Sequence, residues 1–311
     1  MTASSAARSS SSSSQLARTL RAGQFVLTAE IAPPLTCVAD DLLKKALPLR
    51  GLADAVNVTD AASARASLGA VAASALLVHA GIEPILQFTC RDRNRIALQS
   101  DLLGAAALGI HNLLLLTGDD PKAGDQPDAK PVFDLNSQQL LETARDMRDR
   151  GELPSGRKIA GQIDFFLGAA DMPVDPKPEW KPDSLKKKIA AGAAFAQTQF
   201  CMDAGVVRRY TERLREAGIS DFYLLIGVSP LRSAKSAHWM RQNLFGTIIA
   251  DEIVARLEAA SDPAAEGAAI CVDLITEFAS IPGVAGAHIM APGQDAAVPG
   301  VVEAARKRLG R

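Results

Sequence analysis

The chain has 311 residues, of which 48% are hydrophobic and 22% charged, so it can bury a large core as one α/β domain or two small ones. Its 34 basic and 35 acidic side chains give a net charge of −1, which excludes a global basic surface for nucleic acid. No apolar run approaches the ~20 residues that cross a bilayer, so we expect no membrane partner.

The first 22 residues are rich in serine and contain arginines but no acidic residue. Such a segment cannot bury enough apolar surface to offset its ordering entropy, so we expect a disordered tail over 1–22. An organellar transit peptide is the alternative, because its composition is similar. We expect a single catalytic domain over 23–311.

From residue 25 onward, short apolar runs alternate with longer amphipathic ones. The apolar runs predict strands over 25–31, 54–59, 84–90, 112–118, 158–164, 195–200, 222–228 and 284–290. Eight strand–helix units favour a parallel sheet and match an α/β fold of the (β/α)8 TIM barrel type. An open doubly wound sheet is the alternative, disfavoured because no GxGxxG follows the first strand. Extensions are expected at 168–183 and about 234–260.

The cysteines and histidines lie far apart along this pattern, with no CxxC pair and no histidine pair at metal-ligand spacing. They are Cys37, Cys90, Cys201 and Cys271, and His79, His111, His238 and His288. We therefore expect no metal centre and no disulfide framework. Reduced thiols favour a cytoplasmic location.

Polar residues gather at the C-terminal ends of the predicted strands, where a barrel enzyme carries its active site. At the ends of the first four strands these residues are Glu30, then Thr59, then Gln87, Thr89 and Arg91, and finally Thr117 to Asp119. The later strands contribute Gln162, Asp164, Gln197, Gln199, Ser229 and His288. Amides and carboxylates dominate, with no Ser or Cys beside a base. This set suits recognition of a nitrogen-rich heterocycle, with hydride or group transfer left to a cofactor.

Each of these residues also has a purely structural explanation. Glu30 could pair with an arginine after the third strand, and the glutamines could be satisfied core amides. The stretch LLLLTGDDP at 113–121 ends in two adjacent carboxylates, Asp119 and Asp120. Gly-Asp-Asp-Pro is favourable turn chemistry, so local sequence alone leaves both readings open.

Eight segments, in order, resemble the methylenetetrahydrofolate reductase family, the (β/α)8 flavoenzymes that make 5-methyltetrahydrofolate. They are TAEIAPP (28–34), NVTD (57–60), FTCRDRNR (88–95), LTGDDP (116–121), PVFDLNS (131–137), AGAAFAQTQFCMD (191–203), GVSPLRSAK (227–235) and IPGVAGAHIMAPG (281–293). The resemblance implies a folate substrate, FAD as cofactor and NAD(P)H as electron donor. We also expect a homo-oligomer.

The resemblance also implies residue roles. Glu30 would be the general acid that protonates the folate, and Asp119 a second catalytic residue between flavin and pterin. The substrate would be bound by Gln199, Gln197 and Asp119, and the flavin by Thr59, Gln87, Thr89, Arg91, Thr117, Gly118, Asp119 and Lys188.

Some positions depart from the family. Gln87 stands where enterobacterial members have a histidine that contacts the flavin, and the segment near Asp134 lacks a tyrosine of theirs. Two alternatives therefore stay open: a flavin-independent folate oxidoreductase with direct hydride transfer, and a non-catalytic folate- or flavin-binding subunit. The reductase could also run in reverse, in one-carbon catabolism.

Overall fold

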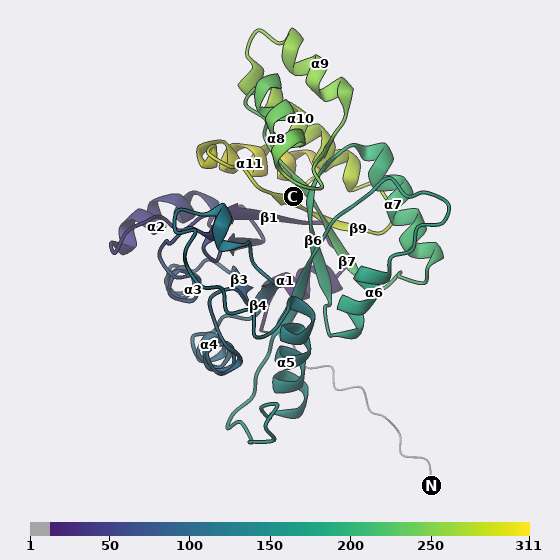
Figure 1. Cartoon of the computed structure of the whole chain (residues 1–311). Coiled ribbons are helices and arrows are strands. Elements are labelled where there is room, and N and C mark those ends of the chain that lie inside the picture. The colour runs from purple at the N-terminus through teal and green to yellow at the C-terminus, as the bar shows by residue number, and fades with distance from the viewer. Residues whose placement is uncertain (1–12) are drawn as a thin grey trace.

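Eight parallel strands close into a barrel in the computed structural model, which describes residues 13–311 (Figure 1). They are β1 (Val26–Ile31), β2 (Ala55–Val58), β3 (Pro84–Thr89), β4 (Asn112–Leu116), β5 (Phe166–Asp171), β6 (Phe195–Met202), β7 (Tyr223–Val228) and β9 (Val284–Ile289). The order around the ring is β5-β4-β3-β2-β1-β9-β7-β6, and the pairing of β5 with β6 closes it. The predicted (β/α)8 barrel is therefore confirmed.

The helices surround this ring (Figure 1). They are α2 (Ala39–Ala46), α3 (Ala70–His79), α4 (Arg95–Ala107), α5 (Ser137–Arg150), α6 (Asp183–Ala190), α7 (Ala204–Glu216), α8 (Ala234–Asn243), α9 (Asp251–Ala259), α10 (Pro263–Phe278) and α11 (Val298–Arg308). The extension expected at 234–260 contains α8, α9 and between them β8 (Ile248–Ile249), which pairs with the end of β6. Within residues 13–311, no helix is both long and apolar enough to cross a membrane.

The fifth strand lies later than the sequence pattern predicts. Residues 158–164 form a mostly exposed loop in which Gly161 has a φ of 91°, whereas β5 begins at Phe166. Strands buried on both faces read as continuous apolar runs, and the run that starts at Phe165 meets this condition better than KIAGQID. The prediction for this strand was wrong. As a consequence, Asp171 ends β5, while Gln162 and Asp164 precede it.

The tail expected to be disordered contains a helix at its end. Residues 1–12 lie outside the described residues, but α1 (Gln15–Arg21) buries Leu16, Ala17 and Leu20. These side chains pack on the first residues of the strands, namely Val26, Ala55, Ile85, Leu114, Phe166, Phe195 and Leu225. The expectation was wrong for this part, because closing the N-terminal end of the barrel provides the apolar burial that orders the helix.

Candidate active site

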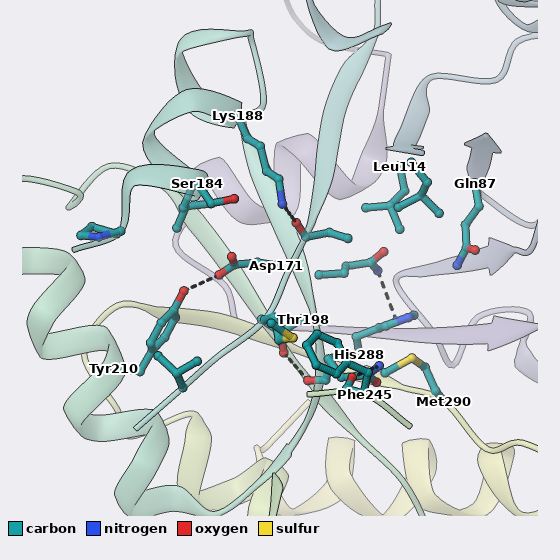
Figure 2. Close-up of a pocket in the computed structure, with 18 of the residues that line it drawn as sticks. Gln87, Leu114, Asp171, Ser184, Lys188, Thr198, Tyr210, Phe245, His288 and Met290 are labelled. Carbon is teal, nitrogen blue, oxygen red and sulfur yellow. Dashed lines mark hydrogen bonds between the residues drawn. The ribbon is translucent and has the colours of Figure 1, made fainter. Parts of the chain in front are cut away.

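A cavity of about 580 Å³ opens at the C-terminal ends of the strands (Figure 2). Its volume lies in the range of sites that bind small molecules and cofactors. Among the residues singled out from the sequence, six line it: Glu30, Gln87, Lys188, Gln197, Gln199 and His288.

Glu30 occupies the end of β1, with its side chain 23% exposed to the cavity. Its Oε2 accepts a hydrogen bond of 2.6 Å from Gln87 Nε2. The same oxygen lies 3.7 Å from His288 Nε2. Glu30 is thus oriented by neighbours from β3 and β9 and still reaches the cavity.

A buried amide network forms the floor beneath Glu30. Gln197 and Asn57 exchange two hydrogen bonds, of 2.6 and 2.9 Å, and Gln197 Nε2 also lies 3.0 Å from Thr28 Oγ1. The same nitrogen is 3.2 Å from His288 Nδ1. Thr28 Oγ1 lies 3.0 Å from the same Nδ1, so both side chains hold the His288 ring with its Nε2 toward Glu30.

Gln199 lies two residues further along β6, within the register shift between Gln197 and Phe200. Its Oε1 accepts from the Phe200 amide at 3.0 Å and its Nε2 donates to the Phe245 carbonyl at 3.2 Å. Phe245 is 85% exposed at the cavity wall. Gln199 therefore connects the strand to the loop that presents this aromatic ring.

Lys188 extends from α6 toward the cavity, where its Nζ donates to the Ala170 carbonyl at 2.6 Å (Figure 2). Leu114 and Leu116 contribute an apolar wall, and Gln87 adds an amide. An apolar wall with a few polar groups at its edge is what a flat ring with polar substituents requires. The donor set of the cavity therefore fits a flavin.

The other residues expected to contact flavin lie at the ends of β2, β3 and β4, beside the cavity lining. Thr59 is buried, and the Thr89 hydroxyl donates to Asp60 Oδ2 at 2.9 Å. The buried Arg91 side chain binds Asp92 at 2.7 Å and the Ala61 carbonyl at 3.3 Å. The Arg91 guanidinium is thus engaged by its own loop.

The Thr117–Asp119 turn completes this edge. Gly118 has a φ of 97°, and a Cβ there would come within 3.0 Å of Arg91 Cβ and 3.1 Å of Thr89 Cβ, so only glycine fits. Exposed Asp119 accepts from the Ser63 amide at 3.0 Å, and Thr117 Oγ1 accepts from the Ser137 amide at 3.3 Å. Asp119 therefore holds the loops after β2 and β4 together.

Cysteine chemistry is disfavoured near the site. Burial raises the pKa of the Cys90 thiol to about 11 and that of Cys201 to about 12. Both thiols stay protonated at neutral pH and behave as small apolar core groups.

Several cavity residues were not found from the sequence. Thr28, which bonds to Gln197 behind the cavity wall, was missed as well, although it lies within the TAEI segment, which was an available signal. Asp171 was missed because the fifth strand was misplaced, although the apolar run FFLGAA ends directly at it. Tyr210 comes from α7 and Phe245 from a loop, and neither carries a local signal.

Comparison with known proteins identifies one family. A family model described as methylenetetrahydrofolate reductase matches residues 15–306. A curated relative, the probable methylenetetrahydrofolate reductase (NADPH) of Caenorhabditis elegans, is 27% identical over 168 residues, which cover 53% of this chain and 23% of the relative. The chain thus matches less than a quarter of that protein's length.

Solved structures share the barrel at low sequence identity. An uncharacterized protein from Clostridium thermocellum that binds two copies of 5-methyl-5,6,7,8-tetrahydrofolic acid has a TM-score of 0.66 at 12% identity, covering 95% of this chain and 100% of that one. EDTA monooxygenase from Chelativorans sp. BNC1 has a TM-score of 0.56 at 12% identity, covering 92% and 98%. Riboflavin lyase, solved with modified FMN and riboflavin, has a TM-score of 0.55 at 10% identity, covering 92% and 91%. These similarities show the fold. The family model, which spans nearly the whole chain, shows more: the chain belongs to the methylenetetrahydrofolate reductase family.

Proposed function

We propose that this protein is an oxidoreductase that converts 5,10-methylenetetrahydrofolate to 5-methyltetrahydrofolate with electrons from NADH or NADPH, or runs the reverse reaction. Family membership supports the reaction class. The folate bound by the Clostridium thermocellum protein supports the substrate class. The observation that carries the proposal is a carboxyl group, Glu30, in the cavity wall 2.6 Å from the Gln87 amide.

In this proposal Glu30 is the general acid. Its proton passes to a nitrogen of the five-membered ring of the folate, the carbon–nitrogen bond at that nitrogen breaks, and the exposed iminium carbon accepts a hydride. Gln87 holds the carboxyl group in position by its hydrogen bond from β3, and His288 lies 3.7 Å away on β9. Gln199 and Asp119 bind the pterin, and Gln197 contributes by fixing His288.

FAD, when bound, would supply the hydride after taking it from NAD(P)H. Lys188 and Gln87 would contact the flavin from the cavity wall. Thr59, Thr89, Thr117, Gly118 and Asp119 would contact it from the edge formed by β2, β3 and β4. Arg91, engaged by Asp92, would keep that edge in shape.

A flavin-independent reaction is the second candidate, favoured by one observation. Most of the residues expected to contact flavin lie beside the cavity lining, not in it. In that case the hydride passes directly from nicotinamide to the folate. An absorbance spectrum of the purified protein from 300 to 550 nm, before and after addition of FAD, separates the two: flavin bands support the first scheme and a colourless protein that ignores FAD supports the second.

Product analysis tests the function itself. The protein is incubated anaerobically with 5,10-methylenetetrahydrofolate and NADH or NADPH, with and without FAD, and the folates are separated by chromatography. We expect 5-methyltetrahydrofolate in at least one combination. A protein that binds the folate but forms no product in any of them would be a binding subunit, and the proposal would be wrong.

A further inference from the structure

The outer surface of the barrel carries an apolar groove between its last two helices. α10 and α11 pack against each other outside the ring, and β9 lies between them in the chain (Figure 1). The groove has a volume of about 800 Å³, larger than the cavity at the strand ends. The two share no lining residue, so the groove is separate from the candidate active site.

Small apolar side chains form most of the walls of this groove. Ala268 and Val272 line it from α10, and Gly300 and Ala304 line it from α11. The members of each pair are four residues apart, so they lie on one face of their helix. Side chains of this size let another helix approach to the short end of the usual interaxial range of about 8–10 Å. The groove therefore has the shape to receive a helix.

The exposed side of α11 carries one free charge of each sign. Glu303 and Lys307 are exposed, and within residues 13–311 neither forms an ion pair, whereas Arg308 pairs with Asp273 of α10 at 2.6 Å. A second α11, antiparallel to the first and related to it by a two-fold axis level with Ala305, brings each Glu303 beside the other copy's Lys307. A parallel arrangement places like charges opposite each other. The charges of α11 are therefore complementary to an antiparallel copy of the same helix.

We propose that this groove is a dimer interface that receives α11 of a second copy of the chain, with Glu303 and Lys307 paired across the two-fold axis. In such an isologous contact each copy contributes the same surface. The small apolar side chains form its centre and the charge pairs its rim, which is the usual arrangement of protein interfaces. Because the groove and the cavity share no residue, the inference is independent of the proposed function.

The test is sedimentation velocity of the full chain over a range of concentrations. We expect the wild type to sediment as a dimer. Ala304→Arg should dissociate at least ~30-fold more readily, because a long charged side chain then occupies the centre of the interface. Ala72→Arg is the matched control: Ala72 is an exposed alanine of α3, outside the groove, so the same substitution there should leave the dimer intact. Gly300→Arg carries the test if Ala304→Arg fails to fold, since a Cβ at Gly300 meets no atom within 4 Å.

Charge reversal tests the two-fold pairing itself. Glu303→Lys and Lys307→Glu each place like charges across the axis, so each alone should weaken the dimer by ~5-fold. The double variant Glu303→Lys/Lys307→Glu restores opposite charges and should recover wild-type association. If Glu303 and Lys307 interacted only within one helix, all three variants would associate like the wild type.

The outcomes are distinct. A wild type that stays monomeric at every concentration overturns the inference and leaves the groove to another occupant. Dimers unaffected by both Ala304→Arg and Gly300→Arg, equal dissociation of Ala72→Arg, or no recovery in the double charge variant also overturns it. A wild-type tetramer that Ala304→Arg splits into dimers supports it.

Discussion

Two glutamines of β6, separated by one residue, have different surroundings and should respond differently to replacement. Gln197 is buried and bonds to Asn57, Thr28 and His288. Gln197→Ala leaves these partners unsatisfied, so we expect it to lower the free energy of unfolding by about 1–3 kcal/mol in urea titrations. Unchanged stability together with a large loss of folate affinity would instead make Gln197 a direct ligand contact.

Gln199 faces the cavity and is bound only to backbone groups of Phe200 and Phe245. We expect Gln199→Ala to weaken folate binding by ~1–3 kcal/mol, since it removes hydrogen bonds to the ligand and loosens the Phe245 loop. Urea unfolding should change little. Gln197→Ala, measured in parallel, is the matched comparison, and an unchanged folate affinity in Gln199→Ala would remove this residue from the site.

At the residue scale, the sequence was informative where side chains come from strand ends. Glu30, Gln87, Gln197 and His288 were found because the C-terminal ends of parallel strands share one edge of a barrel. Asp119 followed the same logic, yet it lies in a turn and binds the Ser63 amide beside the cavity. The fold determines which strand ends meet, but the side-chain direction within a turn depends on contacts that no local pattern contains.

At the scale of elements, α1 closes the N-terminal end of the barrel. Leu16 is fully buried there against the first residues of several strands. We expect Leu16→Ala to lower the free energy of unfolding by about 2–5 kcal/mol, because it removes buried apolar volume and leaves a cavity. Gln15→Ala, an exposed position of the same helix, is the control for urea titrations. A Leu16→Ala variant as stable as this control would mean that α1 does not close the barrel.

The wrong predictions for α1 and β5 show what a sequence pattern cannot tell about a single short element. Serines before residue 15 dominate the composition of the N-terminal segment. The average over the segment therefore hides the seven-residue helix that follows them. KIAGQID alternates enough to suggest a strand, but Gly161 adopts a left-handed conformation there. Both errors arise because distant packing decides which short segment is ordered.

At the scale of the whole molecule, acid should weaken one link between distant loops. Asp134 accepts from the Arg95 backbone amide at 2.9 Å and from its guanidinium at 2.6 and 2.8 Å. These hydrogen bonds lower the pKa of Asp134 to about 2. Since the carboxyl group titrates at ~3.9 in an unfolded chain, the stabilisation is complete above that pH and is lost as the pH falls toward 2.

Thermal melts of the wild type and Asp134→Asn between pH 7 and pH 2 test this link. We expect a small difference in Tm that is constant from pH 7 to about 5 and closes as the pH approaches 2. The pair is surface-exposed, so the difference should be modest. Asp128→Asn, an exposed carboxylate of the same loop region, is the control. A difference that grows on acidification would contradict the assignment.

For the molecule as a whole, counting strand–helix units was sufficient to predict the barrel, because eight parallel units of this length have few other ways to cover both sheet faces. The residues that form the cavity wall could be predicted only in part. Tyr210 reaches Asp171 from a helix outside the ring, and Trp180 packs behind it from a loop. A homo-oligomer and a cytoplasmic location stay predictions.

The most direct test of the proposed chemistry is the turnover of 5,10-methylenetetrahydrofolate by the wild type and by Glu30→Gln, with the exposed Glu179→Gln as control. We predict that Glu30→Gln slows formation of 5-methyltetrahydrofolate by ~10²–10⁴-fold, the contribution of a general acid, while NAD(P)H still reduces bound flavin at nearly the wild-type rate. Equal loss in both half-reactions, or wild-type turnover in Glu30→Gln, would show that Glu30 is not the acid.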